Sequence, residues 1–218
     1  MARGFRRRGS GAGVRYTAQL DALERATVAG LMEQVHDLLD PDPEPDPAPG
    51  SGAGDPGDAG EDATFASIVA GLGMGVTVAA EDQVGVDPSA AGRDPALERL
   101  LPTANREDDE AASEFRRLTE TGLRQRKAAG LALAVSVLRG DDDKLRLDAA
   151  QARAFLTALT DVRLVLGERM GLRTDEDLDL LEAAADDLDP DDPLGYALAV
   201  YDFLTWLQET LAGAMLVA

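Results

Sequence analysis

The chain has 218 residues, of which 44% are hydrophobic, and its 41 acidic and 21 basic side chains give a formal net charge of −20. It has no cysteine, which excludes disulfide bonds, thiolate catalysis and zinc–thiolate sites and fits a reduced, cytoplasmic location. Such an acidic protein repels phosphate backbones from most of its surface and favours a protein partner with a basic surface.

The first 16 residues contain no acidic residue and five arginines, namely Arg3, Arg6, Arg7, Arg8 and Arg15. We expect residues 1–13 to form a flexible tail. Such an arm can make weak contacts to DNA phosphates or a minor groove, or it can dock on the acidic body of the protein itself. Glycines and a serine follow the arginines where a signal peptide needs an apolar stretch, so we do not expect secretion.

Two segments have the same design of a short strand followed by a helix cap. Residues 14–20 lead into Asp21 and Glu24, and residues 144–147 lead into Asp148 and Gln151. In each case the aspartate can accept hydrogen bonds from the first amides of a helix, while the residue three positions later reaches back. We predict that the two strands pair into a small two-strand ribbon that fixes both helix starts.

The first of these helices, predicted to end near residue 39, contains Glu33 and His36. Their spacing is that of di-metal ligands in four-helix bundles, but the chain has no second histidine to complete such a centre. We therefore expect no metal and no cofactor.

Residues 40–62 alternate aspartate with proline and then become rich in glycine, which predicts a disordered acidic linker. Residues 63–80 are uncharged and contain three closely spaced glycines. Acidic residues on both sides and the absence of basic anchors indicate a short helix and turn rather than a membrane span or a phosphate-binding loop.

Three long helices are predicted in the second half, over about residues 107–139, 149–170 and 193–216, with shorter ones at 95–101 and 174–187. We expect Phe115, Leu118 and Leu133 to face the core from the first, and Phe155 and Leu159 from the second. The sequence thus predicts a mainly α protein. Residues 14–218 form a single helical domain, a bundle of five to six helices interrupted by the linker.

Charged residues interrupt the apolar faces of all three long helices. A lone charge beside a core position is costly unless it is paired. We therefore expect one inter-helix polar network that fixes the register, formed by Glu114, Arg117, Glu120, Asp161, Arg163, Asp202 and Glu209.

No serine lies in a nucleophile-elbow sequence, and one histidine would have to serve any triad, so we expect no catalytic residues and no enzymatic activity. The basic stretch 121–127 can touch phosphate or pair with the acidic segment 174–192, and we favour the second interpretation.

The motifs at residues 99–102, 107–110, 114–120, 159–169 and 201–209, with Lys127, resemble an actinobacterial family long described as of unknown function. Its genes lie near that of the Clp-protease adaptor ClpS, and members are identified as oxidative-stress transcriptional regulators of the AosR type. The resemblance implies a regulator that acts through partners such as a sigma factor or RNA polymerase. The disulfide sensing associated with that name is impossible here without cysteine.

The alternative function is that of a helical adaptor linked to Clp proteolysis with no transcriptional role. The oligomeric state stays open.

Overall fold

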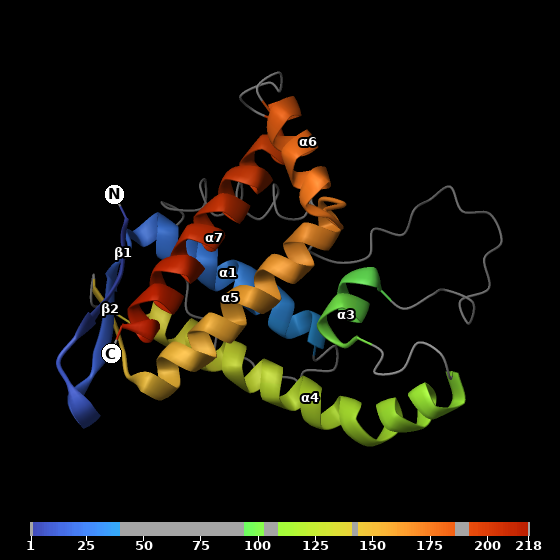
Figure 1. Ribbon diagram of the computed structural model, residues 1–218, viewed down its shortest axis with the longest axis horizontal. Helices are drawn as coiled ribbons and strands as arrows, with labels where there is room; N and C mark the ends of the chain where they lie inside the picture. The colour runs from blue at the N-terminus through green and yellow to red at the C-terminus, as the bar shows by residue number, and fades with distance from the viewer. Residues whose placement is uncertain (1, 40–93, 103–108, 141–143, 186–191, 218) are drawn as a thin grey trace, which may run out of the picture.

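The computed structural model describes residues 2–39, 94–102, 109–140, 144–185 and 192–217, so the predicted linker 40–62 and the segment 63–80 lie outside the described residues. The described part confirms a mainly α fold with a small antiparallel sheet (Figure 1). Its helices are α1 (Ala22–Leu39), α3 (Pro95–Leu100), α4 (Asp109–Leu138), α5 (Ala149–Arg169), α6 (Asp175–Ala185) and α7 (Pro193–Leu216). Its strands are β1 (Arg3–Arg8), β2 (Arg15–Gln19) and β3 (Lys144–Leu147).

Helix α5 is the centre of the fold, and α1, α3, α4 and α7 all pack against it. The predicted core residues Phe155 and Leu159 are fully buried, as is Leu166. The predicted capping box starts the helix, because the Asp148 side chain accepts from the amide of Gln151 at 2.9 Å while the Gln151 side chain accepts from the Asp148 amide.

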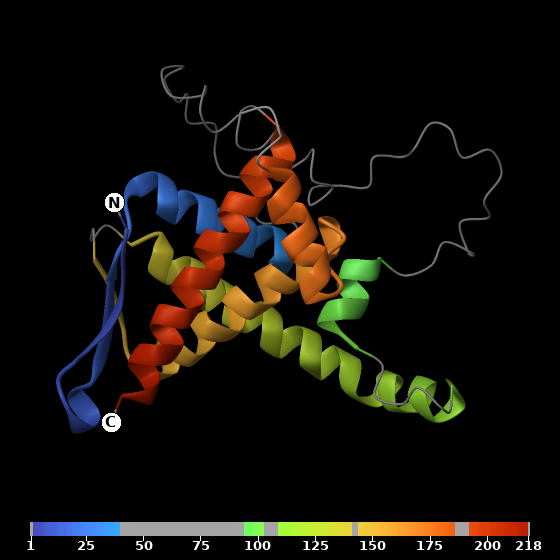
Figure 2. The same cartoon turned by 45° about the horizontal axis from the view of Figure 1, so that its top comes forward.

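Helix α4 does not bury the side chains that the sequence predicts. Phe115 is 53% exposed and Leu118 is 67% exposed. The buried side chains are instead Leu131, Ala134 and Leu138, in the C-terminal half. The N-terminal half of α4 extends past α5 and α7 (Figure 2). Residues 128–138 contain no charged residue and carry apolar side chains all round, so periodicity alone could not select the buried face.

The predicted ribbon is confirmed, because β2 and β3 pair antiparallel with Tyr16 opposite Leu147 and Ala18 opposite Leu145. The sheet is larger than predicted, with the strand order β1-β2-β3. The prediction of a flexible tail at residues 1–13 is wrong, because Arg3–Arg8 form an edge strand paired with β2. Burial of Phe5 explains why this segment is an ordered strand rather than a flexible tail.

The inner face of the sheet is apolar and packs on α5 and α7. Phe5 is 5% exposed and meets the ring of Phe155 edge-on, with 5.7 Å between ring centroids. The glycine-rich stretch after the arginines forms the β1–β2 connection, where Gly9 and Gly11 have φ angles of 77° and 58°. Glycine adopts this left-handed backbone without the steric penalty of a Cβ. No helix in the described ranges is long and apolar enough to cross a membrane.

Candidate nucleic-acid interface

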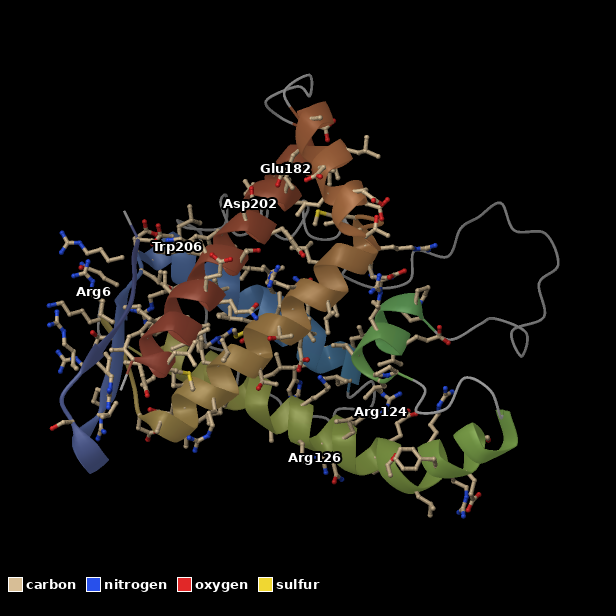
Figure 3. All side chains as sticks on the ribbon, viewed as in Figure 1. Arg6, Arg124, Arg126, Glu182, Asp202 and Trp206 are labelled. Carbon is tan, nitrogen blue, oxygen red and sulfur yellow. The ribbon has the colours of Figure 1, made fainter. Side chains whose placement is uncertain are left out.

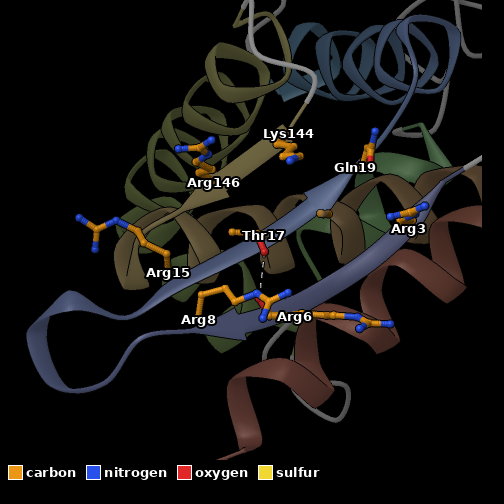
Figure 4. A pocket seen from close by; sticks show the side chains of 9 residues that line it. Arg3, Arg6, Arg8, Arg15, Thr17, Gln19, Lys144 and Arg146 are labelled. Carbon is orange, nitrogen blue, oxygen red and sulfur yellow. Dashed lines mark hydrogen bonds between the residues drawn. The ribbon is translucent and has the colours of Figure 1, made fainter.

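The outer face of the sheet is strongly basic. Strand alternation turns the apolar side chains toward the helices and the charged ones outward. Arg6 and Arg8 of β1, Arg15 of β2, and Lys144 and Arg146 of β3 are all exposed on this face (Figure 4).

A β-bulge adds a sixth cation to this face. Arg8 lies opposite Arg15, Arg6 opposite Thr17, and Arg3 opposite Gln19, so β1 uses one more residue than β2 between Arg3 and Arg6. Simple alternation would place Arg3 and Arg6 on opposite faces. The extra residue keeps Arg3 on the outer face beside Arg6.

The six cations surround a shallow hollow of about 660 Å³. Its lining residues are Arg3, Arg6, Arg8, Arg15, Thr17, Ala18, Gln19, Lys144 and Arg146, none of which is acidic or aromatic. We call this surface the basic sheet face. Without aromatic side chains it offers no platform for stacking bases, so its chemistry suits phosphate groups instead.

Part of this positive charge is left without an ion-pair partner among the described residues. No ion pair joins Arg3, Arg6 or Arg8 to an acidic residue in the described ranges, whereas Lys144 and Arg146 have further interactions within the chain. Asp148 at the margin already caps α5. Its pKa is lowered chiefly by the hydrogen bond from the Gln151 amide, against a smaller opposing effect of burial, with additional help from the positive charge of Arg15. Like charges held this close favour a bound anion.

Four of the five arginines predicted to contact phosphate lie on the basic sheet face. Arg7 points the other way, is half-buried, and donates a hydrogen bond to the carbonyl of Val217. The sequence interpretation missed Lys144 and Arg146 as site residues. The alternation Lys-Leu-Arg-Leu in β3, together with the predicted pairing to β2, was the signal that could have placed them there.

The predicted polar network does not form as one unit in the described residues. Glu114 pairs with Arg117 at 2.8 Å on the exposed surface of α4, where the hydrogen bond from Arg117 lowers the pKa of the Glu114 carboxyl. Glu120 pairs with Arg124 at 2.9 Å on the same helix. These contacts stay within α4 because its N-terminal half lies away from α7.

Two other members of that predicted network are held by partners outside it. Asp161, which is 2% exposed, is bound by Lys127 of α4, and burial raises the pKa of its carboxyl against the opposing effect of Lys127. Arg163 donates to Gln208 at 2.9 Å and to the Tyr201 hydroxyl at 3.3 Å.

Asp202 and Glu209 are exposed on α7, whose buried face is formed by Leu204, Leu207 and Leu211. Figure 3 places Asp202 on α7, well separated from Arg124 on α4. The three leucines are spaced about one helical turn apart and share one face of the helix. Asp202 and Glu209 therefore lie on the solvent side.

The Glu33 and His36 side chains do not converge. Glu33 pairs with Arg139 at 2.6 Å, and His36 lies 3.6 Å from the carboxylate of Asp37. Among the described residues, no cluster of three or more histidine, aspartate or glutamate side chains is placed to hold a metal ion.

In the described residues, the fold and the site define a mainly helical protein whose small sheet presents a basic face. Residues 2–215 match the model of the family described as "Domain of unknown function (DUF2017)", and the chain belongs to this family. No curated protein and no solved structure matches the chain.

Proposed function

We propose that this protein is a non-enzymatic regulator that binds the phosphate backbone of DNA through its basic sheet face and a basic protein partner through its acidic surface. The observation that carries the proposal is the hollow lined by six cations and no acid, in a chain with a net charge of −20. Random placement of charge in so acidic a chain would mix acids into any such surface.

The geometry of the face suits a nucleic-acid backbone. Neighbouring strands are spaced by about 4.8 Å, so the cations of β1 and β3 stand about 10 Å apart across β2. The rows of guanidinium and ammonium groups can follow consecutive phosphates, and guanidinium groups bind phosphate through paired donors. Contacts of this kind position a protein on DNA without reading bases.

The acidic surface lies elsewhere on the molecule, on α6. Glu176, Asp179 and Glu182 are exposed there, and Leu180 between them is 71% exposed. The resemblance to the AosR-type family supports a sigma factor or RNA polymerase as the partner that meets this helix. The DNA contact and the protein contact would then place the regulator at a promoter.

DNA binding is tested by fluorescence anisotropy with a labelled duplex over a range of potassium chloride concentrations. The triple variant Arg3→Gln, Arg6→Gln and Arg8→Gln removes three charges from the basic sheet face. The matched control is the triple variant Arg117→Gln, Arg126→Gln and Arg139→Gln. These three exposed arginines lie on or just after α4, and the net charge of the protein changes equally.

For the sheet variant we expect the slope of log Kobs against log salt to fall by about 3, because each lost phosphate contact removes about 0.9 from the slope. The control should keep the slope of the unaltered protein. Equal loss in both variants, or no binding at all, would overturn a role for this face in DNA binding.

The protein partner is tested by affinity purification of the full chain from cells under oxidative stress. Recovery of a sigma factor or RNA polymerase that is lost when Glu176, Asp179 and Glu182 are changed to glutamine supports the transcriptional role. Recovery of Clp components alone would overturn it in favour of the adaptor role.

A further inference from the structure

A second basic hollow lies near the C-terminal end of α5. This is the end of the helix that lies away from the sheet (Figure 1). It has a volume of about 190 Å³. Arg99 comes from α3, Arg163 from α5, Arg173 and Thr174 from the turn before α6, and Tyr201 from α7. Leu164, Leu172 and Leu178 complete one apolar side.

Two of the three guanidinium groups, those of Arg99 and Arg173, share one carboxylate. Glu168 accepts from Arg99 at 2.7 Å and lies 3.8 Å from Arg173. Asp177 stands near Arg173, but its carboxylate caps the turn by accepting from the Arg173 and Thr174 amides at 2.9 and 2.8 Å. Those backbone contacts lower the pKa of the Asp177 carboxyl, with the Arg173 amide contributing most. The hollow keeps an excess of positive charge.

Of the three arginines of the hollow, Arg163 is the one that forms no ion pair with a carboxylate of the described residues. Its terminal nitrogens donate to two neutral acceptors, the Gln208 side chain at 2.9 Å and the Tyr201 hydroxyl at 3.3 Å. Its carbon centre lies 5.0 Å from the Tyr201 ring centroid, which orients the planar group. Its Nε is buried and has no hydrogen-bond partner. A half-buried guanidinium held by neutral groups keeps its full charge for an anion.

The two hydroxyl groups of the hollow are also able to donate. The Tyr201 oxygen accepts from Arg163, and the Thr174 oxygen accepts from the Asp177 amide at 3.3 Å, so each retains its own proton for another acceptor. The polar side chains that line the hollow are therefore donors, while the nearby carboxylates of Glu168 and Asp177 are already engaged. This donor set matches a tetrahedral oxyanion with several acceptor oxygens.

We infer that this hollow is a binding site for a phosphate group, held chiefly by Arg163 and Arg99 and carried either by inorganic phosphate or by a small phosphomonoester. The leucine side chains leave an apolar wall for a short organic group. Because Arg173 and Thr174 belong to the turn between α5 and α6, the bound anion would tie that turn to α3 and α7. The site is separate from the basic sheet face and does not depend on DNA binding.

Isothermal titration calorimetry on the full chain tests the site at constant ionic strength. Inorganic phosphate, glycerol 3-phosphate and acetate are the three probes. We expect saturable binding of one phosphate group per chain and none for acetate. Tighter binding of glycerol 3-phosphate would identify a phosphomonoester as the natural ligand, and tighter binding of inorganic phosphate would identify the free ion.

The decisive variant is Arg163→Gln, with Arg153→Gln as the matched control because Arg153 is an exposed residue of the same helix outside the hollow. Loss of a charged hydrogen bond should weaken phosphate binding by about tenfold or more in the Arg163 variant and leave it unchanged in the Arg153 variant.

Arg99→Gln provides an independent second variant should Arg163→Gln fail to fold, as judged by its melting curve. No saturable binding, equal binding of acetate, or equal affinity in the Arg163 and Arg153 variants would overturn the inference. Unchanged phosphate binding in the triple variant of the basic sheet face would separate the two sites.

Discussion

At the scale of single residues, the pair Lys127–Asp161 is a largely buried ion pair between α4 and α5. Asp161 is 2% exposed and the Lys127 side chain is 16% exposed. The second carboxylate oxygen of Asp161 is buried and has no hydrogen-bond partner. Two desolvated charges of this kind are tolerated only together, because removal of one leaves the other unpaired in the interior.

We predict that Lys127→Met destabilises the fold by about 3–5 kcal/mol, whereas the double variant Lys127→Met/Asp161→Leu recovers most or all of that loss. Chemical denaturation of the three proteins measures both effects. If the double variant were as unstable as the single variant, the ion pair itself would stabilise the fold, rather than only neutralising two buried charges.

The Lys127→Met variant should also depend on pH in a defined direction. Burial raises the pKa of the Asp161 carboxyl above its ordinary value of 3.8, so the folded state binds the proton more tightly than the unfolded chain does. The protonated form therefore favours folding, fully below pH 3.8 and progressively less as pH rises through the elevated pKa. The stability deficit of the variant should shrink as pH falls, and a deficit that is constant with pH would contradict this assignment.

The sequence identified Asp161 as a charge that needs a partner but selected the wrong one. Hydrophobic periodicity gives the face of a helix that a residue occupies, and this placed Asp161 correctly beside the core. The partner depends on which helices are neighbours and on their axial offset. Those quantities are set by long-range packing, which places Lys127 opposite Asp161 rather than Arg117, the α4 cation of the predicted network.

At the scale of elements, the contact between β1 and α7 explains why the N-terminal segment is ordered. The Phe5 amide donates to the Thr210 hydroxyl at 3.2 Å. A Cβ placed on Gly4 would lie 2.6 Å from Thr210 Cγ2, which is closer than non-bonded carbons approach. The strand thus lies directly on the helix at this point, and only glycine allows that approach.

We predict that Gly4→Ala destabilises the protein by about 1–3 kcal/mol through this overlap. Gly213→Ala in α7 is the control, since nothing lies within 4 Å of its added Cβ, and it should stabilise the helix by about 0.5–1 kcal/mol. Thermal unfolding of the two variants should shift in opposite directions. A shift of the same sign in both would show that β1 does not hold its position on α7.

The sequence did not predict strand β1, although it predicted β2 and β3. In β2 and β3 polar and apolar residues alternate, which is the signal of a half-buried strand. In β1 only Phe5 is buried among four arginines, so composition suggested a solvated tail. The strand is defined by its pairing with β2 and its seat on α7, and neither is a local property.

At the scale of the whole molecule, charge is segregated. The chain as a whole carries −20, yet its sheet presents a basic face. Excess negative charge repels itself and weakens the compact state. The sequence predicted the acidic body directly, because it follows from composition, but it could not show that four separated arginines and β3 share one surface.

We predict that the melting temperature rises when potassium chloride is increased from about 10 mM to about 150 mM, because the Debye length falls from about 30 Å to about 8 Å and self-repulsion is screened. Differential scanning calorimetry in a phosphate-free buffer measures the change. A melting temperature that falls with salt would mean that attraction between the basic sheet face and the acidic helices outweighs the repulsion.

The position of β3 in the chain has a consequence for synthesis. The hairpin of β1 and β2 lies within the first 19 residues and can close within microseconds, but the strand beside it ends at Leu147. During translation the clustered arginines therefore lie on a two-strand hairpin, with one edge of β2 uncovered, until β3 has been synthesised. The basic surface is thus assembled late, after α1 and α4 have emerged, and a nascent chain that stalls before β3 would expose an open strand edge instead.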